Sequence, residues 1–378
     1  MLYIIIVVSF LDTFIQLPII TPYAMELGAS HALTGAIVAI YSLTNMIGNI
    51  IGGHWIDRFG RKRMLLVGML SVAIILLFYP IAQTGNQLLI IRFLHGLAGG
   101  VLIPAAFAYT GDKSKKGTRG KAMAFTGASI GIAAIAGPAI GGAMAARSKI
   151  EYVFIFVSIL FLISTILLIK FVKESFYTTE RGKFTPQEFI PLLKNPAIVQ
   201  ASLAAFALMV SNGTLAFALP LKISEIGLTT ESTGMLLSTF GIMALIVFLT
   251  PINKIYDKYS PITLVVTGLT LIGLAIFSLT FIHTLWIGFV LMVIYGLGFA
   301  FVFPSMNRMV ADVSSQEDRG KAYGVFYAFF SLGVVAGSSI SGVVSQTIGS
   351  PFIVSAIIMI SCGVGLVAIS RKFRVETE

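Results

Sequence analysis

The sequence predicts an all-α integral membrane protein whose twelve transmembrane helices form two pseudo-symmetric bundles of six. Three observations predict this class: an apolar composition, twelve apolar segments, and a second half that repeats the first. Of 378 residues, 57% are hydrophobic and 11% are charged, whereas about a quarter of the residues in soluble domains carry charge. The apolar runs are continuous instead of alternating, which excludes a porin-type barrel.

Twelve apolar segments are each long enough to cross a bilayer, which takes about 20 residues of helix. We expect the first to be retained as a span, because it lacks the small-residue cleavage site of a signal peptide. In chain order the predicted spans are 1–22, 33–53, 64–82, 87–110, 121–145, 151–172, 197–221, 232–253, 261–281, 286–309, 321–346 and 351–370.

The basic residues fix the expected orientation. The net charge is +10, and 22 of the 26 Lys and Arg residues fall in alternate gaps between the spans, in the stretch 170–194 or in the tail. The opposite gaps hold only Arg147, Lys149 and Lys222, and Arg92 lies inside a span. Because cytoplasmic loops carry the basic excess, we expect both termini in the cytoplasm.

An internal repeat predicts the domain organisation. Residues 92–142 and 292–342 share 14 identities over 51 positions at an offset of 200, among them Pro104 with Pro304 and Asp112 with Asp312. An even number of spans separates the copies, which indicates parallel six-span repeats. We expect an N-terminal bundle at 1–172, a cytoplasmic linker at 173–196, a C-terminal bundle at 197–371 and a cytoplasmic tail at 372–378.

The loop between spans 2 and 3 carries Gly53, Asp57, Arg58, Gly60 and Arg61. This pattern resembles the GxxxDRxGRK signature of the major facilitator superfamily, which implies the major facilitator fold over essentially the whole chain. By that resemblance these residues and Asp112 form a conformational latch. In it, Asp57 lies at the N-terminal end of span 11 and Arg61 bridges to Asp112. The alternative is that the basic residues serve only the charge bias of the loop.

Two further motifs resemble those of the family's drug:proton antiporter branch. Span 4 contains Arg92 followed by His95 and Gly96, similar to a family motif built around an intramembrane arginine. Arg92 needs a partner unless its guanidinium reaches the extracellular surface. Span 5 contains Gly137, Pro138, Gly141 and Gly142, which resembles the antiporter motif GxxxGPxxGG, although Ala133 replaces its first glycine. In the family this motif is typical of export. Ordinary helix packing also uses such glycines.

Asp12 is the one acid among sixteen that falls in the interior of a predicted span; the others lie in loops, at span ends or in the tail. A lone intramembrane carboxylate is by default a functional-site hypothesis, because burial favours its protonated form and lets proton binding alternate with opening to each side. Drug:proton antiporters often carry such an acid before a proline, here Pro18. We therefore expect Asp12 and Arg92 to couple proton movement, or else to form a structural pair. The repeat places Asn212 near the matching position, so the coupling is expected to be asymmetric.

By the same resemblance, spans 1, 4, 7 and 10 line a central cavity. Its expected lining is a few polar groups among aromatic side chains, which suits a bulky, partly apolar substrate: Gln16, His95, Tyr109, Asn212, Phe217, Tyr295 and Phe299.

The function expected from these patterns is secondary active transport by alternating access, with proton entry driving export of a small amphipathic compound or drug across the cell membrane. Exporters of endogenous metabolites, siderophores or lipid-like molecules, and uptake symporters or facilitators, share the fold and remain alternatives. An enzyme is not expected, because catalysis in the membrane would need paired acids, histidines or metal ligands. With one cysteine, Cys362, and no nucleotide-binding motif, we expect no metal, no cofactor and no nucleic-acid partner, and a functional monomer.

Overall fold

The computed structural model describes residues 2–113, 119–175, 190–313, 319–347 and 349–377; within these ranges it leaves out the side chains at 2, 53–54, 57–58, 111–113, 119–128, 319–321 and 371–377. The described residues form helices and short connections, with no strand among them. The helices of the N-terminal half are α1 (Leu2–Ile15), α2 (Ile20–Glu26), α3 (His31–Phe59), α4 (Arg61–Leu76), η1 (Tyr79–Ile81), α5 (Gly85–Gly99), α6 (Leu102–Lys113), α7 (Arg119–Arg147) and α8 (Glu151–Phe171).

The C-terminal half continues with α9 (Ile190–Lys194), α10 (Pro196–Glu225), α11 (Thr230–Leu249), η3 (Pro251–Lys254), α12 (Ile255–Lys258), α13 (Pro261–Leu279), α14 (Leu285–Val313), α15 (Arg319–Thr347) and α16 (Pro351–Thr377). Eleven segments of the described chain are long and apolar enough to cross a membrane, and the bent pair α1 and α2 brings the number to twelve. The predicted all-helical membrane fold is therefore confirmed.

Two predicted spans are interrupted. The first turns at residues 16–19, where α1 and α2 meet at a bend of 49°, because Pro18 has no N–H to continue the helical bonding. The fourth is divided at residues 100–101 into α5 and α6. Each break ends a helix close to residues expected to be functional.

Local signals in the sequence explain where several helices begin. The side chains of Ser30, Thr84, Asn195 and Ser260 each accept a hydrogen bond from a backbone N–H in the first turn of the following helix. These residue types are favoured at such positions because they satisfy N–H groups that have no partner within the helix.

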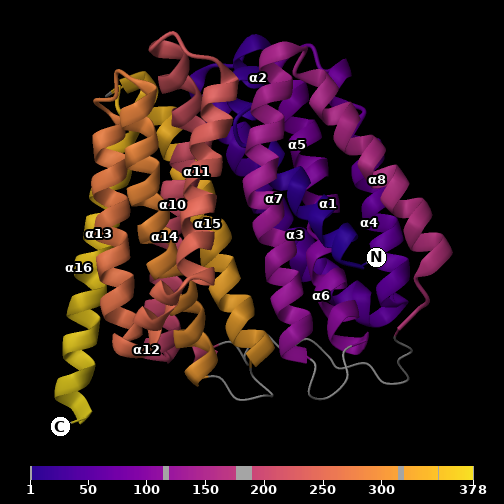
Figure 1. Ribbon diagram of the computed structural model, residues 1–378. Helices are drawn as coiled ribbons and strands as arrows, with labels where there is room; N and C mark the ends of the chain where they lie inside the picture. The colour runs from indigo at the N-terminus through magenta and orange to yellow at the C-terminus, as the bar shows by residue number, and fades with distance from the viewer. Residues whose placement is uncertain (1, 114–118, 176–189, 314–318, 348, 378) are drawn as a thin grey trace. The chain divides into compact units, whose positions relative to one another are not determined.

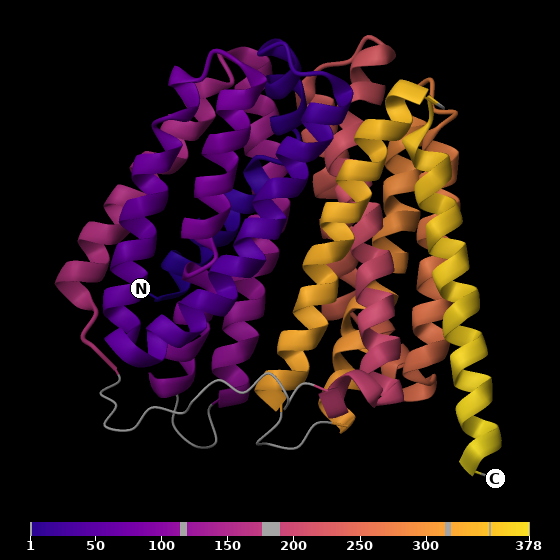
Figure 2. The same cartoon turned by 180° about the vertical axis from the view of Figure 1, so that it is seen from behind.

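The chain divides into two compact units. The first comprises Met1–Lys183 with Gly227–Ser238, and the second comprises Phe184–Ile226 with Thr239–Glu378. In Figures 1 and 2 each unit is a bundle of long helices, coloured indigo to magenta in the first and mostly salmon to yellow in the second. In the first unit α1 packs on α7 and α3 packs on α5; in the second, α10 packs on α15 and α13 packs on α14.

Candidate functional site

The C-terminal end of α1 holds the two polar residues from which the site is built. Asp12 and Gln16 are one helical turn apart, and Gln16 Nε2 donates a hydrogen bond to Asp12 Oδ1 at 2.7 Å. Their side chains are 2% and 3% exposed. The break before Pro18 places Gln16 just beyond the last residue of α1, Ile15.

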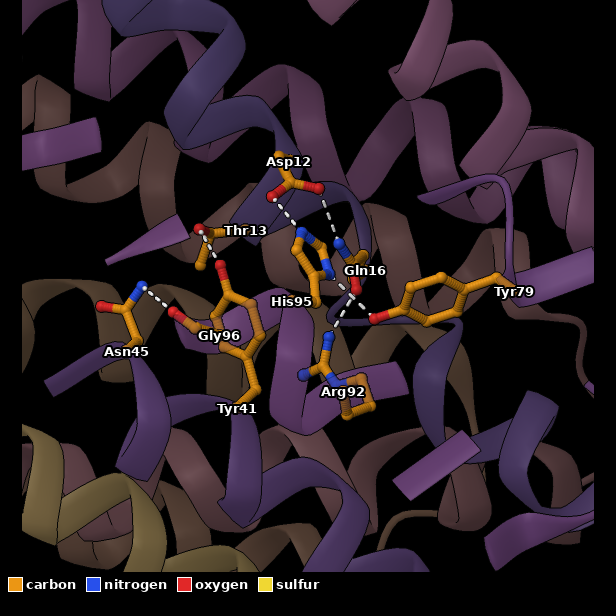
Figure 3. A network of polar contacts seen from close by, with 9 residues as sticks. All are labelled: Asp12, Thr13, Gln16, Tyr41, Asn45, Tyr79, Arg92, His95 and Gly96. Atoms are coloured by element: carbon orange, nitrogen blue, oxygen red, sulfur yellow. Dashed lines mark hydrogen bonds and ion pairs between the residues drawn. The ribbon is translucent and has the colours of Figure 1, made fainter. Parts of the chain in front are cut away.

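His95 is the second partner of the Asp12 carboxylate. His95 Nε2 lies 3.0 Å from Asp12 Oδ2, and His95 Nδ1 lies 2.8 Å from the hydroxyl of Tyr79. The imidazole is completely buried. Figure 3 shows the ring held between the two groups, with Asp12 on one side and Tyr79 on the other.

Arg92 lies one turn before His95 on α5 and connects to Asp12 through Gln16. Its Nη1 donates to Gln16 Oε1 at 2.5 Å, and its Nε donates to the Ile37 carbonyl at 3.4 Å. The residue is 5% exposed. The guanidinium therefore turns toward other residues of the first unit instead of extending to the extracellular surface, and a neutral amide stands between the two charges.

Aromatic rings enclose these polar groups. The Arg92 guanidinium carbon lies 4.3 Å from the centroid of the Tyr41 ring, a distance at which a cation is attracted to the ring face. α3 and α5 approach each other closely at Gly96 because this residue has no side chain: a β-carbon there would lie 3.0 Å from Tyr41 Cα. Tyr79 stacks on Phe154 with ring centroids 4.1 Å apart.

Sequence reasoning placed Asp12 and Arg92 together but missed the two tyrosines and gave His95 a different place. Tyr79 lies at the end of the third span, followed by Pro80, and Tyr41 lies within an apolar helix, so neither carries a chemical signature in the sequence. His95 and Gln16 were expected to line a substrate cavity, whereas here both are buried and bond to Asp12.

The second unit carries a neutral counterpart of the Asp12–His95 contact. Tyr295 matches His95 at the repeat offset of 200, and its hydroxyl lies 2.9 Å from Ser211 Oγ and also hydrogen-bonds Asn212. The ring of Phe240 meets Tyr295 edge to face, as Tyr41 meets His95. The packing is repeated, while the carboxylate and the imidazole of the first unit are replaced at the matched positions by the amide of Asn212 and the phenol of Tyr295.

The other expected cavity residues make contacts that do not involve the Asp12 site. Tyr109 is on α6, where its hydroxyl donates to the Lys173 carbonyl at 2.8 Å. Phe217 is fully buried in α10. Phe299 stacks on Phe303 and packs beside Ala244, Val247 and Ala300.

Glu174, which the sequence did not single out, binds the backbone of the signature loop. Gly60 joins α3 to α4 with φ of +98°, a conformation that favours glycine. The Glu174 carboxylate accepts hydrogen bonds from the backbone N–H of Arg61 at 2.9 Å and of Lys62 at 3.1 Å. Burial raises the pKa of Glu174, but these bonds and those from Ser175 and Arg63 outweigh it, so the pKa lies below the usual value for Glu.

Gly60 also makes room for that carboxylate, because a β-carbon at this position would lie 2.6 Å from Glu174 Oε2. Arg61 Nη1 donates to the Ile56 carbonyl at 2.9 Å. The side chains of Asp57, Arg58 and Asp112, like position 53, lie outside the described residues. The bridge expected between Arg61 and Asp112 therefore stays a prediction.

The glycines of the antiporter motif pack α7 on the helix that carries Asp12. A β-carbon at Gly137 would lie 2.7 Å from Phe14 Cβ, and one at Gly141 would lie 2.9 Å from Ile15 Cγ1. Gly142 faces another part of the first unit, where a β-carbon would lie 2.6 Å from the Thr230 carbonyl oxygen. Pro138 is inside α7. The motif thus sets the distance between α7 and the end of α1.

Comparison with known proteins identifies the family. The protein-family model described as Major Facilitator Superfamily matches this chain twice, at residues 2–208 and 201–377. The chain belongs to the Major Facilitator Superfamily. The two matches, one for each half, agree with the internal repeat, and the chain is a multi-pass membrane transporter of this superfamily.

Curated relatives within the superfamily are named for multidrug resistance. The chain is 26% identical over 382 aligned positions to Multidrug resistance protein 2 of Bacillus subtilis (strain 168), with 97% of this chain and 93% of that protein covered. It is 27% identical to Multidrug resistance protein MdtG of Citrobacter koseri, with 88% and 84% covered. These names are consistent with the drug:proton antiporter branch.

Solved structures agree on the fold. A bacterial homologue of the human lysosomal transporter Spinster, in an inward-facing and unoccupied conformation, superposes with a TM-score of 0.79 at 16% identity, covering 97% of this chain and 94% of the other. This likeness supports the major facilitator fold.

Proposed function

We propose that this protein is a proton-coupled antiporter that exports small amphipathic compounds, including drugs, across the cell membrane by alternating access. The observation that carries the proposal is the buried Asp12 carboxylate, held by Gln16 and His95 and linked through Gln16 to Arg92. The names of the curated relatives and the antiporter motif packed against α1 support export as the direction. Both termini lie in the cytoplasm in this proposal, following the basic loops.

The chemistry follows from the site's charges. A carboxylate in a low-dielectric environment is costly unless it is paired, so neutralising it with a proton and pairing it with a charged network are alternative ways to stabilise it. Proton binding therefore competes with the contacts that Asp12 makes in this conformation. An exporter uses that competition when the protonated and unprotonated forms favour opening to different sides.

The proton gradient is the proposed source of energy, with no cofactor, and the functional unit is a monomer. The substrate class follows from the phenylalanine-rich spans and from the relatives: a bulky and partly apolar molecule. The chain contains 29 Phe residues.

The test is transport by purified protein in proteoliposomes with an imposed pH gradient, using ethidium, a lipophilic cationic dye, as the probe. Wild-type protein should move the dye against its gradient in exchange for protons, and Asp12→Asn should lose this while keeping passive dye exchange. Asp312→Asn, an exposed acid on α14, is the matched control and should transport normally.

Full gradient-driven transport by Asp12→Asn would reject proton coupling through Asp12. Accumulation of dye together with protons, in the direction of the gradient, would indicate uptake by symport instead. Normal transport of an endogenous metabolite with no movement of dye would retain the mechanism and replace the substrate class.

A further inference from the structure

The hydrogen bonds around Asp12 run in one direction. Arginine can only donate hydrogen bonds and a carboxylate can only accept them, so an ionised Asp12 is the acceptor at the end of two paths. One path runs from Arg92 to Gln16 Oε1 and from Gln16 Nε2 to Asp12. The other runs from the Tyr79 hydroxyl to His95 Nδ1 and from His95 Nε2 to Asp12.

These directions assign the tautomer of His95. With Asp12 ionised and the imidazole neutral, Nε2 must carry the hydrogen that faces Asp12 Oδ2, so Nδ1 must accept the hydrogen of the Tyr79 hydroxyl. In this state the group of Asp12, Arg92 and His95 has a net charge of zero. Tyr79 therefore holds His95 in the form that has room for one more proton.

An added proton must reverse one of the two paths. On Asp12 Oδ1 it would face the Gln16 amide nitrogen; turning that amide around would direct its hydrogens at Arg92, which is itself a donor. On the His95 side, only the Tyr79 O–H needs to rotate, because the Tyr79 oxygen has lone pairs and can accept from His95 Nδ1. The path through His95 is therefore the one that reverses when a proton is added.

We propose that Asp12 and His95 bind the transported proton as a pair, with Tyr79 as the positioning residue that controls how tightly the pair holds it. This rests on the proposed function. When a proton from water binds, a new N–H bond forms at His95 Nδ1, Tyr79 changes from donor to acceptor, and the imidazolium stays bonded to the Asp12 carboxylate. The net charge of the group rises from zero to one, and release of the proton reverses each change.

The surroundings of the pair offer few competing ionisable groups. Facing it are Arg92 on α5, Tyr41 on α3 and Tyr79 on η1, with Tyr23 of α2 donating to the Tyr79 carbonyl. The other helices against α1 are α6, α7 and α8. The titratable side chains that the structure describes on these three helices have other partners or are exposed. Tyr109 donates to the Lys173 carbonyl, and Arg147 pairs with Glu231. Glu151 lies near Tyr23 and Glu26, while Tyr152 and Lys170 are exposed.

Nitrogen NMR on the full-length protein labelled with ¹⁵N-histidine tests the pair without any substrate. The chain has four histidines, and the signal lost in His95→Gln identifies His95. We expect the Nε2–H tautomer at alkaline pH and a doubly protonated ring at acid pH. Tyr79→Phe keeps the ring stacked on Phe154 but removes the hydroxyl that accepts the new Nδ1–H of the imidazolium. A bond to the charged ring is worth more than the bond to the neutral ring, so the titration midpoint should move to lower pH by about 0.5 to 1 unit.

The control is Tyr256→Phe, which removes a hydroxyl that donates to the Ala300 carbonyl at 2.8 Å in the second unit and should leave the midpoint unchanged. The same variants are then compared in the dye exchange assay. The pH dependence of the dye exchange rate should show two overlapping steps for the wild type and one step for His95→Gln. For Tyr79→Phe it should show the same shift in midpoint that NMR detects.

A His95 ring that stays neutral throughout the range in which exchange titrates would overturn the paired site, as would a Tyr79→Phe midpoint that is unmoved or higher. If Asp12→Asn then still loses coupling, the proposed function stands without the pair. If instead the pair titrates as expected but Asp12→Asn transports normally, the pair stands and the proposed function fails.

Discussion

The amide of Gln16 lies between the Asp12 carboxylate and the Arg92 guanidinium, donating to the first at 2.7 Å and accepting from the second at 2.5 Å. The neutral amide thus links the buried carboxylate and the buried guanidinium by hydrogen bonds without a direct contact between the two charges. It also means that one side chain bonds both charges, in addition to the contacts of Asp12 with His95 and of Arg92 with the Ile37 carbonyl. Their stabilisation can therefore be tested by changing Gln16 alone.

Gln16→Leu should destabilise the protein by about 1 to 3 kcal/mol, because a buried charged donor and a buried charged acceptor each lose a partner. Thermal unfolding of the detergent-solubilised protein measures the change. Gln200→Leu, at a glutamine that is 9% exposed in the second unit, controls for loss of a buried amide. Equal melting of the two variants would contradict a bridging role for Gln16.

Arg92→Lys should lower both stability and proton-driven transport although it keeps the positive charge. The guanidinium reaches Gln16, the Ile37 carbonyl and the Tyr41 ring at once, which a lysine ammonium cannot do because its donors radiate from one atom. Arg308→Lys, at a half-exposed arginine on α14, should be close to neutral. Normal transport by Arg92→Lys would show that charge alone suffices.

Gly137→Ala should push α1 away from α7 and reduce transport, with a loss of about 1 to 3 kcal/mol from overpacking. The added methyl would lie 2.7 Å from Phe14 Cβ, whereas the same change at Gly363 meets no atom within 4 Å. The two variants are compared by thermal unfolding and by dye exchange. If Gly363→Ala is as damaging as Gly137→Ala, contact between α7 and α1 is not the cause.

Glu174→Ala should destabilise the protein by about 1 kcal/mol near neutral pH, since Glu174 caps the first turn of α4. The folded-state pKa of Glu174 lies below its usual value. Its contribution is therefore present above the unfolded value of about 4.3 and is lost as the pH falls through the folded pKa. Unfolding temperatures of wild type and variant should differ near pH 7 and converge in acid. An equally large difference at both pH values would indicate lost packing instead of lost charge.

Much of the fold followed from sequence because hydropathy and repetition act over many residues at once. The twelve apolar segments and the internal repeat each depend on composition over long stretches. The bend at Pro18 was not predicted, although it also has a simple cause in the missing N–H of proline. The interruption between α5 and α6 did not follow, because glycines such as Gly99 and Gly100 are common within membrane helices as well as at their ends.

The site was predictable only in part. Asp12 and Arg92 stood out because charge is rare inside spans. Gln16, His95 and Tyr79 did not stand out as a bonded group, because their meeting depends on the rotation of α1, α5 and η1 about one another, which no local pattern encodes. Glu174 was missed for a similar reason: 113 positions separate it from Arg61, and in the sequence it is one acid in a polar linker.

The hydroxyl pair of Ser211 and Tyr295 has an electrical consequence. In the proposed mechanism the first half binds a proton, whereas the matched position of the second half holds the neutral groups of Ser211 and Tyr295, so no change of charge is expected there during a cycle. Each elementary charge that crosses 100 mV exchanges about 2.3 kcal/mol with the membrane potential. In this mechanism the membrane potential therefore acts on the changing charge of the group around Asp12. At the matched position of the second half there is no charge for the potential to act on.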